Sequence, residues 1–348
     1  ILHIDARNIK IKMSVPGSGQ TGKKFLVKVN IETSGLRLFC AKRVIAQVDI
    51  NNVMLGKTEH QEMIFELKNS ENTFEYEMDT VRCGRINVTC KAVCVMDIFG
   101  LFSIRTSDFK IHDITMYPEE LELNVVLSKT TIGATKDDGF MQNRKGSDPS
   151  EMYDIREYVP GDDIRSIHWK LSGKMDNLIL RQASEPTHYQ AVIMPDFWVA
   201  DVKDDIIFEQ INKAASICFE IGRQLLKNGV AFCMALVQKN GLTLSEIRNE
   251  TDFKNAVTQW MSMRIPDVNG LGMKYFLMEH LEQKFTRLLI ISAGRYTQDL
   301  SVLNEQIGVL AVSVVNDINQ IHSQMNGTCE LVEIPAEGNI DENYQIIC

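Results

Sequence analysis

The first third of the chain alternates apolar and polar residues. Every second residue is apolar in the runs 9–13 and 25–31, which is the period of a strand that buries one face. Turn-forming clusters at 16–19 and 68–72 separate such runs. Short strands at this spacing, without a sustained helical period, are typical of an antiparallel β-sandwich. We therefore expect residues 1–115 to form an immunoglobulin-like β-sandwich module.

After Tyr189 the pattern changes to long apolar runs that alternate with helical periods. Apolar residues between Ile207 and Leu225 recur at helical spacing, which predicts one face of a long helix that ends at Asn228–Gly229. Further helices are expected at 252–263, 273–284 and 300–307. Continuous apolar runs predict strands at 191–194, 230–237, 287–292 and 308–315, with a short last strand at 329–334. Apolar strands that alternate with helices predict a doubly wound, mostly parallel α/β sheet within residues 116–348.

Composition and charge restrict the possible functions. A chain of 348 residues with 44% hydrophobic and 24% charged residues fits a protein of more than one globular domain. The formal net charge of −9 argues against nucleic acid as a partner, because phosphate binding needs a concentrated basic surface. The eight cysteines form no zinc or redox spacing and several lie in apolar runs, which favours a reducing compartment. No run approaches the roughly 18 apolar residues of a membrane helix.

Charged and aromatic residues are densest in the segment 153–182, called the signature segment below. It follows the polar stretch 131–150, which we expect to be a loop. Pro160–Gly161 fits the centre of a type II turn. The candidate site residues are Arg156, Glu157, Tyr158, Asp162, Asp163, Arg165, His168, Trp169 and Lys170. They form either a docking surface or acid–base site, or an internal ion-pair network that holds the segment against the neighbouring domain.

Two ordered motifs carry a resemblance to a known family. The first runs Arg-Glu-Tyr-x-Pro-Gly-Asp-Asp-x-Arg from Arg156 to Arg165 and continues with Ile167, Trp169 and Lys170. The second is Arg-x-Gly at 82–84 followed by Asp-Ile-Phe-Gly-Leu-Phe at 97–102, where Ile replaces the usual Pro. Together they resemble the domain of unknown function 58 family, and two motifs in order are more specific than one.

This resemblance has implications for fold, location and partner. It implies a von Willebrand A-like fold for residues 116–348, with the signature segment included. It also implies N-terminal membrane helices before Ile1, which would tether the full-length protein to the cytosolic face of the plasma membrane. The implied partner is a MoxR-type AAA+ ATPase.

The same resemblance directs attention to a metal-binding loop. A von Willebrand A domain holds a divalent metal with an Asp-x-Ser-x-Ser loop after its first strand, because a hard cation needs converging oxygen ligands. At the matching place this chain has Asp196, Trp198 and Ala200, and Ala293 stands at a later ligand position. One carboxylate among such neighbours does not build an ordinary site. We expect a degenerate metal loop, no bound metal and no other cofactor.

The leading hypothesis is a non-catalytic interaction or scaffolding protein. Its docking surface would include Arg156, Glu157, Asp162, Arg165 and Trp169. The first alternative is a metal-assisted hydrolase that uses Asp162, Asp163, His168 and Asp196. A Ser or Cys nucleophile pattern does not accompany these residues. The second alternative is a structural assembly subunit. The methionines at 261, 263, 273 and 278 are expected to lie in the core.

Overall fold

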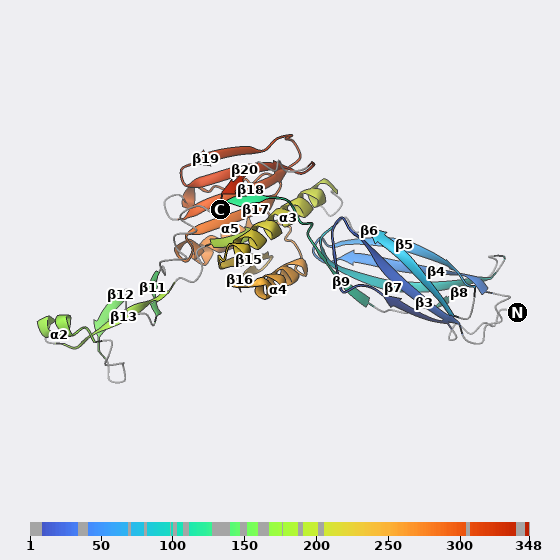
Figure 1. Ribbon diagram of the computed structural model, residues 1–348, viewed down its shortest axis with the longest axis horizontal. Coiled ribbons are helices and arrows are strands. Elements are labelled where there is room, and N and C mark those ends of the chain that lie inside the picture. Colours follow the sequence, from blue (N-terminus) through green and yellow to red (C-terminus); the bar gives the residue numbers. More distant parts are fainter. Residues whose placement is uncertain are drawn as a thin grey trace.

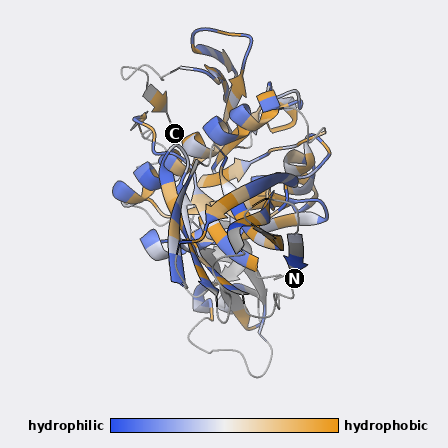
Figure 2. Ribbon diagram, turned by 90° about the vertical axis from the view of Figure 1, so that its right-hand side faces the viewer, coloured by the Kyte–Doolittle hydropathy of each residue, from blue (hydrophilic) through white to orange (hydrophobic). Residues whose placement is uncertain are grey.

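Strands outnumber helices in the computed structural model, a mixed α/β protein with antiparallel sheets and one mostly parallel sheet (Figure 1). The structure describes residues 9–33, 41–68, 71–79, 82–97, 99, 103–106, 111–126, 140–146, 152–158, 167–175, 177–186, 191–200, 205–303, 307–338 and 345–347. Figure 2 shows hydrophobic residues gathered in strands of the interior and hydrophilic residues on outer loops and helix surfaces. The combination of antiparallel and mostly parallel sheets agrees with the fold class expected from the sequence.

Two sheets make up the N-terminal part of the chain. One has the order β1-β3-β6, and the other has the order β2-β9-β7-β4-β5 with β8 paired to β7. The strands are β1 (Ile9–Ser14), β2 (Ser18–Gln20), β3 (Lys24–Thr33), β4 (Ala41–Asn52), β5 (Lys57–Glu66), β6 (Glu71–Asp79), β7 (Gly84–Asp97), β8 (Ser103–Thr106) and β9 (Ile111–Tyr117). All pairs are antiparallel except that of β2 with β9.

The alternation along these strands explains how the two sheets pack. Val27, Val29 and Ile31 of β3 are fully buried, and they share one core with Val44 and Val48 of β4. Each such side chain contributes roughly 1.5–3 kcal/mol when it leaves water. The strand period predicted for 25–31 is therefore confirmed.

A seven-stranded sheet of order β16-β15-β14-β17-β18-β20-β19 forms the C-terminal part. Its strands are β14 (Ala191–Pro195), β15 (Phe232–Gln238), β16 (Gly241–Ile247), β17 (Arg287–Ala293), β18 (Gly308–Val315), β19 (His322–Asn326) and β20 (Cys329–Pro335). The inner strands are parallel, whereas β16 and β19 join the two edges antiparallel. The mostly parallel sheet is thus present, with antiparallel edge strands that the sequence pattern did not predict.

Helices cover both faces of this sheet. The helical elements are α3 (Asp205–Lys227), α4 (Glu250–Met261), α5 (Leu271–Met278) and the 3-10 turns η3 (Leu281–Gln283) and η4 (Ser301–Leu303). Ile193 of β14 packs in the core that contains residues of α3 and α4. Its neighbours Val192 and Met194 pack on the other face, in the core that contains residues of α5. Burial on both faces explains why β14 is continuously apolar.

Three local predictions are wrong. The helix expected at 300–307 is only the 3-10 turn η4 within the described residues. The expected loop 131–150 contains the strand β11 (Phe140–Gly146). Met278 is 64% exposed rather than part of the core, because it ends α5 at the surface, whereas Met261 and Met273 are buried as expected.

The signature segment belongs to a separate small sheet. Strands β11, β12 (Met152–Glu157) and β13 (Ile179–Pro186) form an antiparallel sheet of order β11-β13-β12. The short helix α2 (Trp169–Met175) lies beside it, and Figure 1 shows this unit projecting from the seven-stranded sheet. A further parallel pair joins β10 (Asn124–Val126) to β21 (Gln345–Ile347). The projecting unit therefore presents a surface of its own.

Side chains from the N-terminal sheets meet α3 at the junction of the two parts. Arg82 Nη2 and Lys57 Nζ each lie 2.7 Å from Asp205 Oδ1. Both cations also lie over the Phe208 ring, 5.0 Å (Arg82) and 5.2 Å (Lys57) from its centroid. Hydrogen bonding from Lys57 is the main cause of a lowered pKa of Asp205. Lys57 and Arg82 thus each form an ion pair with Asp205 and a cation–π contact with Phe208 of α3.

Backbone contacts extend the junction. The backbone N–H of Cys83 donates to Oδ1 of Asn212 in α3 at 2.9 Å. Gly84 has φ +121°, and a Cβ there would lie 2.8 Å from Oδ1 of Asn52 and from Cβ of Met54. Only glycine fits this position without displacing its neighbours. The Arg-x-Gly motif at 82–84 therefore joins the two parts of the chain.

Candidate functional site

The indole of Trp169 is exposed to solvent at the start of α2. Trp169 is 63% exposed, and Leu178 nearby in the chain is 45% exposed. Lys170 and Lys174 of the same helix are also exposed. Single exposed apolar side chains are common on protein surfaces, but tryptophan is enriched at binding interfaces.

Hydrogen bonds fix the helix that carries Trp169. The N–H of Ile179 donates to Oγ of the buried Ser172 at 2.8 Å, and that hydroxyl donates to the carbonyl of His168 at 3.1 Å. The N–H of His168 donates to the carbonyl of Ile179 at 2.8 Å. These contacts tie α2 to the first residue of β13. The exposed indole therefore stands on a fixed support.

His168 takes part in the support itself. Its Nδ1 accepts a hydrogen bond of 3.3 Å from the N–H of Leu171 in the first turn of α2. This contact requires Nδ1 without a proton, which places the proton of the neutral ring on Nε2. His168 thus acts as a cap of α2.

The structure places part of the predicted signature set. Glu157 ends β12 and accepts a hydrogen bond of 3.1 Å from Nδ2 of Asn177, and Tyr158 follows with its N–H bonded to the carbonyl of Leu178. The backbone of Arg156 pairs with Leu180. The side chain of Arg156, together with Asp162, Asp163, Arg165 and the turn Pro160–Gly161, lies outside the described residues. Glu157, Tyr158, His168, Trp169 and Lys170 therefore belong to one small unit.

A second cluster lies at the C-terminal ends of β14 and β17. The chain leaves β14 toward β15 on one side and returns at β17 on the other, which makes this edge the switch point where α/β proteins bind ligands. Asp196 follows β14 directly and is only 3% exposed. The N–H of Gly272 donates to its Oδ1 at 3.0 Å. Its Oδ2 is buried and receives no hydrogen bond of good geometry among the described residues, although the hydroxyl of Tyr296 lies near enough to act on the charge of the carboxyl.

The carboxylate of Asp196 completes the start of α5. The residue before this helix is Gly270, which supplies no side-chain cap, so the first N–H groups need another acceptor. A Cβ on Gly272 would lie 2.8 Å from Cγ of Asp196, so a glycine permits this approach. Burial raises the pKa of Asp196 to about 6, although the N–H groups of Gly272 and Met273 and the hydroxyl of Tyr296 oppose the rise.

The hydroxyl groups of Ser292 and Ser313 are engaged in hydrogen bonds with each other and with the backbone. Oγ of Ser292 donates to the carbonyl of Gly294 at 3.0 Å and lies 3.1 Å from Oγ of Ser313. The N–H of Tyr296 donates to that Ser313 oxygen at 3.1 Å. Sequence reasoning missed Gly272, Tyr296 and Ser313, and the Gly-Leu-Gly spacing at 270–272 was the one available signal.

The donor set at this edge does not fit a metal of the von Willebrand type. Trp198 is half-buried, Ala200 is exposed and Ala293 is buried, and none of the three offers a side-chain oxygen. Oδ1 of Asp196 already accepts a hydrogen bond from the N–H of Gly272. Across the described ranges, no group of three or more His, Cys, Asp or Glu side chains could share an ion. At this edge of the sheet, Asp196 caps helix α5, and its neighbours do not provide the converging oxygen ligands that a hard cation needs.

Fold and site together define a mixed α/β protein, with one mostly parallel sheet and several antiparallel ones, in which a small projecting unit carries an exposed tryptophan. The family model "Protein of unknown function DUF58" matches residues 154–338, more than half of the chain. The chain therefore belongs to the DUF58 family.

Other comparisons add little. A cohesin module of a Clostridium perfringens glycoside hydrolase is 12% identical, with 31% of this chain and 96% of that chain covered and a TM-score of 0.22. A CARDB domain from Pyrococcus furiosus is 12% identical, with 31% and 91% covered and a TM-score of 0.23. The Bacillus subtilis sporulation control protein Spo0M is 12% identical, with 40% and 58% covered and a TM-score of 0.21. These TM-scores support no conclusion on fold or function. No curated protein matches.

Within the described residues, none of the helices has the length and apolar content needed to cross a membrane.

Proposed function

We propose that this chain is an interaction protein that recruits a partner protein through the α2 surface, defined as Trp169, Lys170, Lys174 and Leu178. The observation that carries the proposal is the exposure of Trp169 on a helix whose position is fixed by hydrogen bonds. Tryptophan is enriched among residues that dominate binding energy. A support that is already ordered lowers the entropic cost of association.

Charge around the indole gives the α2 surface a polarity. Lys170 and Lys174 are exposed on the same helix as Trp169, and Glu157 is exposed at the end of β12. Apolar contact at the indole supplies affinity, and charges at the rim supply orientation and speed of encounter. The sequence also assigns Arg156, Asp162 and Arg165 of the signature motif to docking, and their side chains lie outside the described residues.

The finer identity is part of the proposal. We infer a von Willebrand A-like fold for the α/β part, an association with the membrane and a location at the cytosolic face of the plasma membrane. The partner is a MoxR-type AAA+ ATPase. Membership of the DUF58 family and the position of Asp196 directly after β14 support this inference. The metal-assisted hydrolase and the structural assembly subunit remain alternative predictions.

Binding of the purified ATPase to the full-length protein tests the proposal. Trp169→Ala is expected to raise the Kd by at least about tenfold, the range of interface tryptophans. Met278→Ala removes a side chain of similar exposure, 64% against 63%, from the end of α5 and serves as the control. Equal affinity of the two variants, with both folded, would refute the α2 surface as the docking site.

A further inference from the structure

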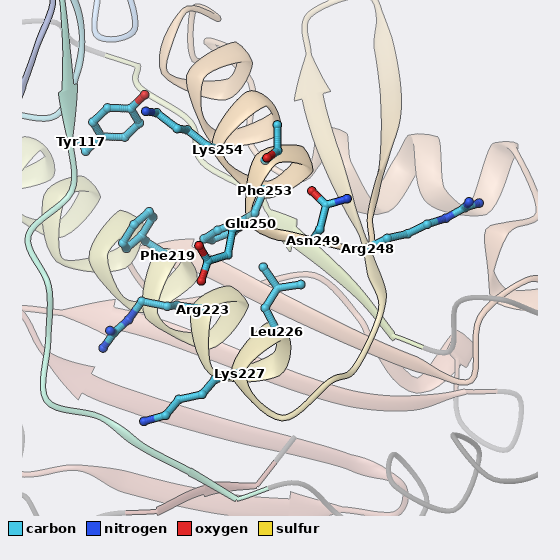
Figure 3. A pocket seen from close by; sticks show the side chains of 11 residues that line it. Tyr117, Phe219, Arg223, Leu226, Lys227, Arg248, Asn249, Glu250, Phe253 and Lys254 are labelled. Carbon is cyan, nitrogen blue, oxygen red and sulfur yellow. The ribbon is translucent and has the colours of Figure 1, made fainter.

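A groove of about 980 Å³ lies between α3 and the first half of α4 (Figure 3). Tyr117, from the end of β9, closes it on the side of the N-terminal sheets. Its volume lies at the upper end of the range for small-molecule pockets, about 300–1,000 Å³. Both parts of the chain therefore contribute to one depression.

The floor of the groove is apolar and firmly packed. The rings of Phe219 and Phe253 stack with centroids 5.3 Å apart. Phe253 packs so closely on α3 that a Cβ on Gly222 would lie 2.6 Å from its ring. The hydroxyl of Tyr117 lies 2.8 Å from Oγ1 of Thr258 and is thereby held in place. Such a floor offers a preformed seat for an aromatic or aliphatic side chain.

Cations dominate the rim. Arg223 pairs with Glu220, with Nε 2.9 Å from Oε2, and is engaged inside the chain. Lys227 and Lys254 are exposed and make no ion pair within the described residues. Glu250 is the acidic residue of the lining. Arg248 also lines the groove and pairs with Glu246, so Lys227 and Lys254 are the cations of the lining that remain for an acidic ligand.

The separation of Lys227 and Lys254 favours an extended ligand over a compact one. Figure 3 shows Lys254 at the Tyr117 end of the groove and Lys227 at the opposite end. A compact anion meets one lysine at a time, whereas an extended chain with several carboxylates reaches both. An apolar floor between separated cations is complementary to an acidic peptide with one apolar anchor.

We infer that this groove binds an acidic segment of a partner protein, with an aromatic or aliphatic residue seated on Phe219 and Phe253 and carboxylates facing Lys227 and Lys254. The inference rests on the proposed function as an interaction protein, but it uses a surface separate from Trp169. The partner thus contacts the α2 surface at one site and the groove at another.

Selection of short random peptides on the immobilised full-length protein identifies the ligand class. The expected result is enrichment of sequences with net negative charge and one aromatic or aliphatic residue. The Kd of the best enriched peptide is then measured against Lys227→Glu and Lys254→Glu. Each charge reversal is expected to raise the Kd by about tenfold and to weaken the salt dependence. Lys274→Glu, an exposed lysine of α5 on the other face of the sheet, is the control and leaves the Kd unchanged.

Three outcomes overturn the inference. Enrichment of no acidic sequence removes the ligand class. Unchanged affinity in both lysine variants removes the groove. Binding of a single-stranded DNA oligonucleotide that is lost in Lys227→Glu and Lys254→Glu, with no acidic peptide enriched, assigns the lysines to nucleic acid. Trp169→Ala must leave peptide binding intact, so failure of the groove and failure of the α2 surface are scored on different variants.

Discussion

The carboxylate of Asp196 accepts a hydrogen bond of 3.0 Å from the backbone N–H of Gly272 and so joins the end of β14 to the start of α5. The two residues are far apart in sequence, and α5 has no cap from its own preceding residue. An aspartate that follows the first strand of the sheet thus serves the fold as a helix cap. The carboxylate of Asp196 therefore has a structural role that needs no metal. Trp198, Ala200 and Ala293 provide no side-chain oxygen for one.

Gly272→Ala tests that contact. The added Cβ would lie 2.8 Å from Cγ of the buried Asp196, so either the helix or the carboxylate must move. We expect a loss of about 1–3 kcal/mol in the free energy of unfolding, the usual cost of overpacking. Urea titration measures it. Gly173→Ala, where nothing lies within 4 Å of the new Cβ in helix α2, is the control. An equal effect of both substitutions would contradict the cap.

The protonation of Asp196 makes stability depend on pH. Its pKa rises from 3.8 to about 6 on folding because the carboxyl is buried. The folded state therefore binds more protons than the unfolded state between these values, and stability falls as pH rises from about 4 to 7. Two pKa units correspond to up to about 3 kcal/mol. Asp196→Asn keeps the acceptor and removes the titration, so its stability relative to wild type improves over this range.

Denaturation of both proteins from pH 4.5 to 7.5 measures this difference. Asp299→Asn is a control of opposite sign, because hydrogen bonds from Ser301 lower the pKa of the exposed Asp299. The charged Asp299 stabilises the fold at neutral pH, and this contribution is lost as pH falls. Asp299→Asn is therefore less stable than wild type at neutral pH, and the difference shrinks at acidic pH. Parallel pH profiles for wild type and Asp196→Asn would contradict a buried, titrating Asp196.

The support of Trp169 depends on Ser172. Ser172→Ala leaves the N–H of Ile179 without its acceptor at 2.8 Å, which costs about 1–3 kcal/mol for a buried donor. Hydrogen exchange at the Ile179 amide should accelerate by about tenfold to a hundredfold. Ser323→Ala, which removes an exposed hydroxyl bonded to Glu330, is the control and leaves that amide unaffected. Unchanged protection of Ile179 in Ser172→Ala would count against this support.

The junction between the two parts depends on Asn212. Asn212→Ala removes the acceptor for the N–H of Cys83 at 2.9 Å, at a cost of about 1–3 kcal/mol. We expect the N-terminal sheets to unfold separately at a lower temperature in calorimetry. Glu209→Ala changes an exposed residue of the same helix and is the control. A single unaltered transition in Asn212→Ala would show that the junction does not depend on this contact.

Elements with strong periodicity could be predicted from the sequence, and elements at the edges could not. The helix expected between Ile207 and Leu225 is α3, and the strand predicted at 308–315 is β18. Burial on one or both faces imposes a visible pattern on such elements. The edge strand β19 is exposed throughout and has no apolar alternation. Its place in the sheet comes from pairing with β20, which local sequence does not encode.

The candidate sites show the same division. The signature segment pointed to Trp169, and the von Willebrand A-like loop that the family resemblance implied pointed to Asp196. The neighbours of the Asp196 carboxyl could not be found, since Gly272 and Tyr296 come from distant segments that only the fold brings together. The groove likewise combines Tyr117 of β9 with Phe219 of α3 and Phe253 of α4. Surfaces built from several elements require the structure.

Hydrogen exchange of the full-length protein, with and without the MoxR-type ATPase, tests the docking proposal most directly. We expect the ATPase to protect residues 167–179, which carry Trp169, Lys170 and Leu178 and are tied together through Ser172. Protection should disappear in Trp169→Ala at the same ATPase concentration and persist in Met278→Ala. Binding of the ATPase without any change in exchange at 167–179, or no binding at all, would contradict the proposal.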